Sequence, residues 1–151
     1  INYMDHEPEE GEVVEVYTHE KAYIATGHYQ IGSIMVRVLS FDNECIDTDF
    51  YRKKIRIAYD VRKSIGVAEN PNNNTYRLIH GEGDNLPGLV VDIYGKTAVM
   101  QAHSVGMHCD RNIIAEAMKD ELAGIVENIY YKSETTLPFK AVFGSENTVQ
   151  T

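Results

Sequence analysis

The sequence lacks any apolar run of the ~18–20 residues that a membrane-spanning helix needs. No basic segment followed by an apolar stretch opens it, so we expect no signal peptide and no membrane partner. Cysteine is scarce: Cys45 and Cys109 lie in different segments without metal-ligand spacing around them. They are expected to be reduced thiols, and the absences together favour a cytoplasmic protein without a disulfide framework.

Positive charge is also scarce, and it is concentrated in one segment. The net charge of −9 argues against a chain that coats nucleic acid over its whole surface. Residues 1–48 carry a net charge of −8 and residues 67–151 carry −5, whereas residues 49–66 carry +4. This segregation is more informative than the total, because it singles out one element as a candidate for binding anions.

The first 48 residues alternate between apolar and polar side chains in a way that predicts strands at 12–17, 23–29 and 34–39. Gly27 marks a bulge or a close approach of two backbones in the second strand. The run around Cys45 and Ile46 is a candidate fourth strand. We expect a small antiparallel sheet or barrel, which is small for independent stability. Since the chain starts with Ile1, we expect it to be a piece of a longer protein.

A helix is predicted from about Asp49 to Ile65, with Asp47 or Thr48 as its cap and Gly66 as its end. One apolar stripe is expected on it, formed by Phe50, Ile57, Val61 and Ile65. The polar, turn-rich segment 69–74 follows and cannot pack a core. The chain is therefore expected to divide into a domain at 1–48, a connecting helix at 49–66 and a domain at 67–151.

The clearest local pattern is the stretch YRLIHGEGDNLPGLVVDIYG at residues 76–95. It predicts two strands, at 76–80 and 89–94, joined by a loop of turn-forming residues. Gly81 and Gly83 allow positive φ, and Pro87-Gly88 suits a type II turn. A third strand is expected at 97–102 after a tight turn at residues 94–96.

The remaining sequence predicts one helix and two strands. The helix runs from Val105 to about Leu122, and Gly124 ends it. Its expected buried line is Met107, Ile114, Met118 and Leu122. Strands are expected at 125–131 and at 139–143. The predicted fold class is α+β: a partial antiparallel sheet, a basic connecting helix, and a small domain of strands, one helix and further strands.

The basic helix is the leading candidate for a binding function. Six cationic side chains in one element can neutralise phosphates, and each contact adds salt-dependent affinity for RNA. The opposing interpretation is a solvated helix face or a contact with acidic neighbours in another part of the protein. The candidate RNA-binding residues are Arg37, on a strand, and Arg52, Lys53, Arg56 and Lys63, on the helix.

Two other groups of residues are candidate sites. The run His80-Gly81-Glu82-Gly83-Asp84 holds an imidazole and two carboxylates that could serve acid–base chemistry or bind a metal. It also fits a rigid turn in which Asp84 bonds backbone amides, and no third ligand or nucleophile stands at a fixed spacing. Cys109, early in the predicted helix, could be a thiolate activated by the helix dipole, although no second partner is visible.

The residues also carry a family resemblance. Five segments resemble the large-subunit ribosomal-RNA methyltransferases of the cytosine-C5 type. They are GEVVEVYTHEKAYIATGHY, SIMVRVLS, IDTDFYRKKIRIAYDVR, the stretch at 76–95 and IYYKS at 129–133. These are S-adenosylmethionine-dependent enzymes with an N-terminal PUA domain. The most specific part is RLIHGEGDNLPGLVVDIYG, in which Asn85 stands where the family often has glycine.

The resemblance implies a PUA domain that binds RNA, a central α+β domain and a C-terminal methyltransferase domain. On this basis the chain corresponds to a truncated PUA part and the central domain, and the catalytic domain is expected outside it. Neither Cys45 nor Cys109 falls in the family's catalytic motifs, so no catalytic residue is assigned. The implied partners are large-subunit ribosomal RNA and the protein's own methyltransferase domain, with pairing to a second copy left open. S-adenosylmethionine is expected in the parent protein rather than in this part.

Overall fold

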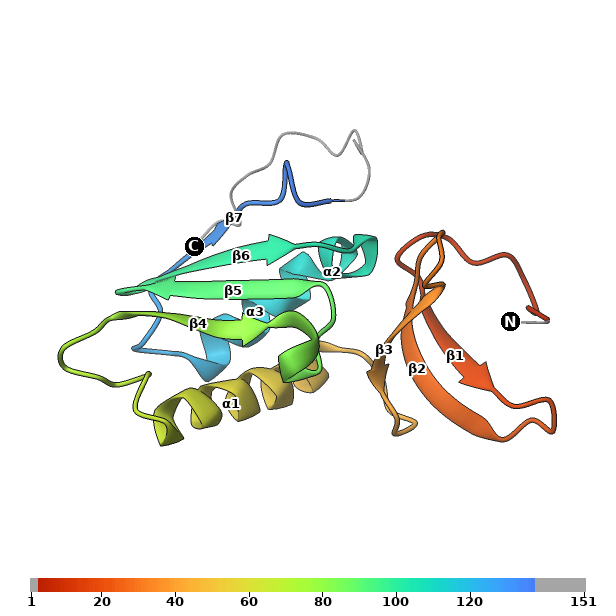
Figure 1. Cartoon of the computed structure of the whole chain (residues 1–151), viewed down its shortest axis with the longest axis horizontal. Helices are drawn as coiled ribbons and strands as arrows, with labels where there is room; N and C mark the ends of the chain where they lie inside the picture. Colours follow the sequence, from red (N-terminus) through yellow and green to blue (C-terminus); the bar gives the residue numbers. More distant parts are fainter. Residues whose placement is uncertain (1–2, 138–151) are drawn as a thin grey trace.

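The computed structural model describes residues 3–137, which form two sheets, the second of which carries the helices (Figure 1). The first sheet has the order β1-β2-β3 and is antiparallel throughout. The second sheet has the order β4-β5-β6-β7, in which β7 runs parallel to β6 and the other pairs are antiparallel. The α+β class expected from the sequence is confirmed.

The strands and helices follow the chain in a simple order. The first sheet consists of β1 Val13–Tyr17, β2 Tyr23–Tyr29 and β3 Val36–Ser40. Helix α1 Thr48–Ser64 leads to the second sheet, which consists of β4 Thr75–His80, β5 Leu89–Tyr94, β6 Thr97–Ala102 and β7 Asn128–Tyr131. A 3-10 turn, η1 Gly81–Asp84, joins β4 to β5, and α2 Val105–Cys109 and α3 Arg111–Glu121 join β6 to β7.

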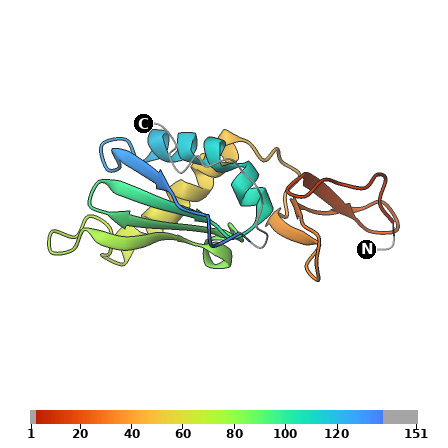
Figure 2. The same cartoon turned by 90° about the horizontal axis from the view of Figure 1, so that it is seen from above.

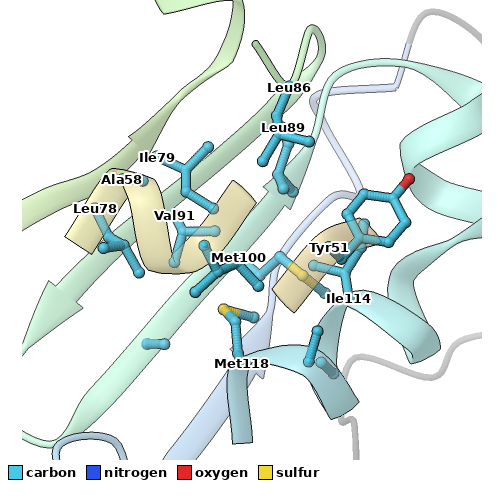
Figure 3. Packing of buried hydrophobic residues seen from close by; sticks show 14 of the residues in the cluster. Tyr51, Ala58, Leu78, Ile79, Leu86, Leu89, Val91, Met100, Ile114 and Met118 are labelled. Carbon is cyan, nitrogen blue, oxygen red and sulfur yellow. The ribbon is translucent and has the colours of Figure 1, made fainter. Parts of the chain in front are cut away.

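The helices cover one face of the second sheet, and the first sheet lies at one end of this layered unit (Figure 2). Side chains from α1, α3 and the strands of the second sheet meet in one hydrophobic core (Figure 3). Leu39 of β3 joins the same core. The expected division of the chain at residues 48 and 66 stays a prediction, although α1 shares its core with the second sheet.

Helix α1 begins as predicted, with the Asp47 carboxylate accepting the Phe50 N–H at 2.9 Å. Its buried face differs from the predicted stripe. Phe50 is buried, but Ile57, Val61 and Ile65 are exposed. The residues that face the core are Phe50, Tyr51, Ile55, Ala58 and Tyr59. The helix sequence contains two apolar stripes, and the one that includes the tyrosines is buried. Burial of this stripe is possible because both tyrosine hydroxyls form hydrogen bonds: Tyr51 donates to Asp110 and Tyr59 donates to Glu69.

The single helix predicted from Val105 to Leu122 is two helices, α2 and α3, separated at Asp110. Ser104 caps α2 by accepting the Met107 N–H. The predicted buried line is confirmed, because its four apolar side chains are at most 1% exposed. The Asp110 carboxylate bonds to His28 of β2 and Tyr51 of α1, at 2.9 and 2.6 Å. These bonds to β2 and α1 favour a break between α2 and α3 at Asp110. The apolar periodicity of the segment does not indicate this break.

The strand ends also differ in places from the predicted ones. No strand forms at Cys45–Ile46, because the hydroxyl of Ser40 bonds to the Asp42 N–H and the Glu44 carboxylate in a turn that leads into α1. The first half of the strand predicted at 125–131 is part of the loop after α3. The strand predicted at 139–143 lies outside the described residues.

Candidate nucleic-acid interface

A cleft of about 570 Å³ lies between the first sheet and the turn after β4. One wall is β3 and the residues just after it, and the other is the loop that carries η1. Residues 36–42 line it together with Ile34, Glu44, Lys54, Glu82, Asn85 and Pro87. We call it the β3–η1 cleft. Its volume falls within the range of about 300–1,000 Å³ that is typical of ligand pockets.

Arg37 belongs to this cleft and also to a second one of about 280 Å³, which is lined by His80, Glu82 and His103 among others. The guanidinium Nε of Arg37 is buried and has no hydrogen-bond partner among residues 3–137. No carboxylate of the described residues lies within ion-pair distance of Arg37. A buried hydrogen-bond donor without a partner lowers the stability of the fold. Arg37 is therefore a candidate for donating to an anionic ligand.

The loop that forms the other wall is rigid for reasons its sequence anticipates. Gly81, Asn85 and Gly88 have positive φ, and the Leu89 N–H donates to the Leu86 carbonyl across the Pro87-Gly88 turn. The left-handed residue in the middle of the loop is Asn85 rather than Gly83, which has an ordinary φ. Asparagine tolerates this conformation better than most residues. The cleft is thus lined by a fixed backbone.

Asp84 holds this loop in place, which accounts for its carboxylate. It accepts two hydrogen bonds from Arg62, at 2.5 and 2.7 Å, and one from the His80 backbone N–H at 2.6 Å. This geometry favours the rigid-turn interpretation of residues 80–84. Within residues 3–137, no group of three or more His, Cys, Asp or Glu side chains could hold a metal ion.

The four candidate cations on α1 all lie beside carboxylates. Arg52 donates hydrogen bonds to Asp120 and Asp49, and the bond to Asp120 raises the pKa of Arg52 above its usual value. Arg56 pairs with Glu121, at 2.7 Å, and donates to its carbonyl. The Lys53 and Lys63 ammonium groups lie 3.8 Å from Glu44 and 3.0 Å from Glu69. The interpretation as a contact with acidic neighbours therefore has direct geometric support.

Sequence reasoning missed Phe41, the most exposed aromatic side chain at the β3–η1 cleft, with 75% of its surface exposed. It also left Lys54 and His103 out of the candidate set. The available signal was an aromatic residue inside the polar turn SFDNE, where nothing local requires one.

Cys109 is the last residue of α2 and not an early residue of a long helix. It directly precedes Asp110, the N-cap of α3, so a carboxylate stands between the thiol and the N-terminus of that helix. Cys109 is exposed, but partial desolvation by its surroundings raises the pKa of the thiol, and the neighbouring Asp110 carboxylate raises it too. The sequence-based idea of an activated thiolate at this position was wrong.

Comparisons with known proteins define the class to which this architecture is similar. Residues 1–41 match the model of a PUA-like domain. A protein from Streptococcus mutans, provisionally named a SAM-dependent methyltransferase, has a similar fold, with a TM-score of 0.72 at 19% sequence identity; the match covers 85% of this chain and 34% of that one. A second methyltransferase structure, complexed with SAH, matches with a TM-score of 0.71. At these identities the likeness concerns the fold alone.

Relatives in sequence are more specific. The chain is 34% identical over 139 residues to "Ribosomal RNA large subunit methyltransferase I" from Aliivibrio fischeri. The aligned region covers 91% of this chain and 34% of that protein. It is 37% identical over 119 residues to the protein of the same name from Vibrio cholerae, with 78% and 30% covered. The chain thus spans about a third of the length of these relatives.

No helix in the described part of the chain combines the length and the apolar character that crossing a bilayer requires.

Proposed function

We propose that this chain is the RNA-positioning part of a SAM-dependent methyltransferase of the cytosine-C5 family that acts on large-subunit ribosomal RNA. The observation that carries the proposal is the similarity over 91% of the chain to a relative named a ribosomal RNA large subunit methyltransferase. The cytosine-C5 part of the proposal rests on the resemblance of the sequence motifs. The PUA-like match at residues 1–41 supports a role in RNA binding. In this proposal the chain holds the RNA, and a methyltransferase domain of the parent protein, outside this chain, makes the bond.

The parent's methyl donor would be SAM, which supplies an electrophilic methyl group. The described residues do not fit a site for it. The glycines at 81 and 83 lie in a 3-10 turn between antiparallel strands, so no helix N-terminus follows them. Neither cleft combines such a loop with a parallel strand end, where cofactors of this kind bind. We therefore assign no residue of this chain to the cofactor.

RNA contact would involve Arg37 in the cleft and the α1 cations Arg52, Lys53, Arg56 and Lys63. Exposed ion pairs contribute little to stability, so a phosphate can replace their carboxylate partners at small cost. Arg62 differs from these residues because its pair with Asp84 is largely buried. We propose that Arg62 stays paired while the exposed cations exchange partners.

Replacing Arg52, Arg56 and Lys63 together with alanine is expected to weaken RNA binding and flatten its salt dependence. Each lost phosphate contact removes about 0.7–0.9 from the steepness of log K against log salt, so three lost contacts should reduce it by about 2–3. The measurement is a salt titration of RNA affinity. Lys96→Ala is the matched control, since Lys96 pairs with Glu127 at the far turn between β5 and β6.

A competing function for α1 is structural, and the pairs of Arg52 with Asp120 and Arg56 with Glu121 favour it. In that case the triple variant would unfold at a lower denaturant concentration and keep the slope of the unmodified chain. An unchanged slope would remove these residues from the RNA-binding surface.

A further inference from the structure

We infer that the β3–η1 cleft is a subsite for one unpaired nucleotide of single-stranded RNA, with Phe41 stacking on its base and Arg37 contacting its phosphate. This inference rests on the proposed function, from which the RNA comes, and adds the part of the RNA that the cleft takes. Two independent observations carry it: an exposed aromatic ring beside an apolar wall, and a buried guanidinium donor without a partner among the described residues.

Phe41 is 75% exposed directly after β3, where it supports no hydrophobic core. Ile34, 56% exposed, and Pro87 add apolar surface to the same cleft. Exposed apolar side chains are common singly, but several that gather at one cleft are typical of a binding site. Nucleobases stack on aromatic rings with little sequence preference, because every base has a π-face.

The charges around the cleft limit how much RNA can enter it. Arg37 and Lys54 are its cations, and the Lys54 ammonium lies 5.3 Å above the Phe50 ring. The carboxylates of Asp42, Glu44 and Glu82 line the same space. A groove that followed the RNA backbone would need more cations than carboxylates, so this cleft suits one phosphate and one base.

A base must leave its stack to reach Phe41, which selects for single-stranded RNA. In an RNA duplex the bases are stacked and paired, and side chains reach mainly the 2′-hydroxyls and phosphates. The cleft is therefore expected to discriminate between an unpaired strand and the same strand in a duplex. Discrimination of this kind is independent of the salt-dependent contacts proposed for α1.

The absence of tryptophan from the 151-residue sequence makes the test direct. Phe41→Trp places a single fluorophore at the cleft, and Tyr94→Trp places one at an exposed position at the end of β5 as a control. The probe is a short single-stranded RNA, compared with the same strand annealed to its complement. We expect the single strand to quench Phe41→Trp but not Tyr94→Trp, and the duplex to quench neither.

Two further variants separate the stacking contact from the phosphate contact. Phe41→Ala should weaken binding of the single strand by about 5- to 150-fold, the range for loss of one stacked base, and leave the salt slope unchanged. Arg37→Gln should lower the slope by about 0.7, the contribution of one phosphate on a single strand. Both side chains lie at a cleft and outside the main core, so the fold should survive each change.

Each contrary outcome has a distinct meaning. If the single strand binds and the α1 triple variant alters its salt slope, but Phe41→Trp is not quenched, the subsite is wrong and the proposed function stands. If the chain binds neither RNA, both fail. If the fluorescence of the Phe41→Trp variant changes with protein concentration in the absence of RNA, a second copy of the chain covers this position, and the subsite is again wrong.

Discussion

Replacing Arg62 with alanine is expected to lower the free energy of unfolding by about 3–5 kcal/mol, the usual cost of leaving one partner of a buried ion pair alone. The side chains of Arg62 and Asp84 are 14% and 8% exposed, and two hydrogen bonds join them. The Arg62 Nε also donates to the Arg77 carbonyl at 3.0 Å, so the guanidinium ties α1 to β4 and to the turn η1. Without it, the His80 N–H is the one hydrogen-bond donor that Asp84 keeps among residues 3–137.

The measurement is urea unfolding of the variant and the unmodified chain, followed by circular dichroism. Arg52→Ala is the control on the same helix, because the Arg52 pairs are exposed and should matter far less. The double variant Arg62→Leu, Asp84→Leu leaves no unpaired charge and should recover part of the loss. Equal losses for Arg62→Ala and Arg52→Ala would contradict a special role for the buried pair.

Local patterns in the sequence were sufficient for β4, β5 and β6 and for the turn between β4 and β5. The strands at 89–94 and 97–102 have the predicted bounds, because alternating side chains and turn residues encode them within a few positions. The bulge or close backbone approach predicted at Gly27 is also present. Thr26 and Gly27 flank a shift in the β2–β3 register, and a Cβ on Gly27 would lie 2.3 Å from the Arg37 carbonyl oxygen.

Features that depend on distant residues were not predictable in this way. The buried face of α1 is decided by partners such as Asp110, which lies 59 residues from Tyr51 in the chain. The break between α2 and α3 has the same cause. Likewise, the acidic partners of Arg52 and Arg56 include residues at the end of α3, so a list of charges along α1 could not show them.

The candidate site shows the same division. Arg37 could be proposed from the sequence because it is a cation on a strand of the PUA-like part. The cleft around it could not, since Phe41 and Glu82 are brought together only when the first sheet packs beside the β4–β5 loop. A site made by two distant segments leaves no spacing pattern in either of them.

Replacing Gly106 with alanine is expected to disrupt the packing of the first sheet against α2. A Cβ at this position would lie 2.1 Å from Cγ and 2.3 Å from Nδ1 of His28, which is closer than real contacts allow. His28 is 1% exposed and its Nε2 bonds to Asp110, so the ring cannot move into solvent without losing that bond. We expect destabilisation of about 1–3 kcal/mol, as for other overpacked cores, concentrated in the first sheet.

Amide hydrogen exchange is the appropriate measurement, because it reports on β1–β3 and β4–β6 separately. Gly106→Ala should raise exchange in β1–β3 and leave the central strands of the second sheet protected. Gly83→Ala is the matched control: its Cβ would lie 3.6 Å from the His80 ring, an ordinary contact, and its φ is not positive. Uniform destabilisation of both sheets would show that they unfold as one unit. Selective loss in β1–β3, accompanied by weaker binding of single-stranded RNA, would show that the packing of His28 on α2 maintains the β3–η1 cleft.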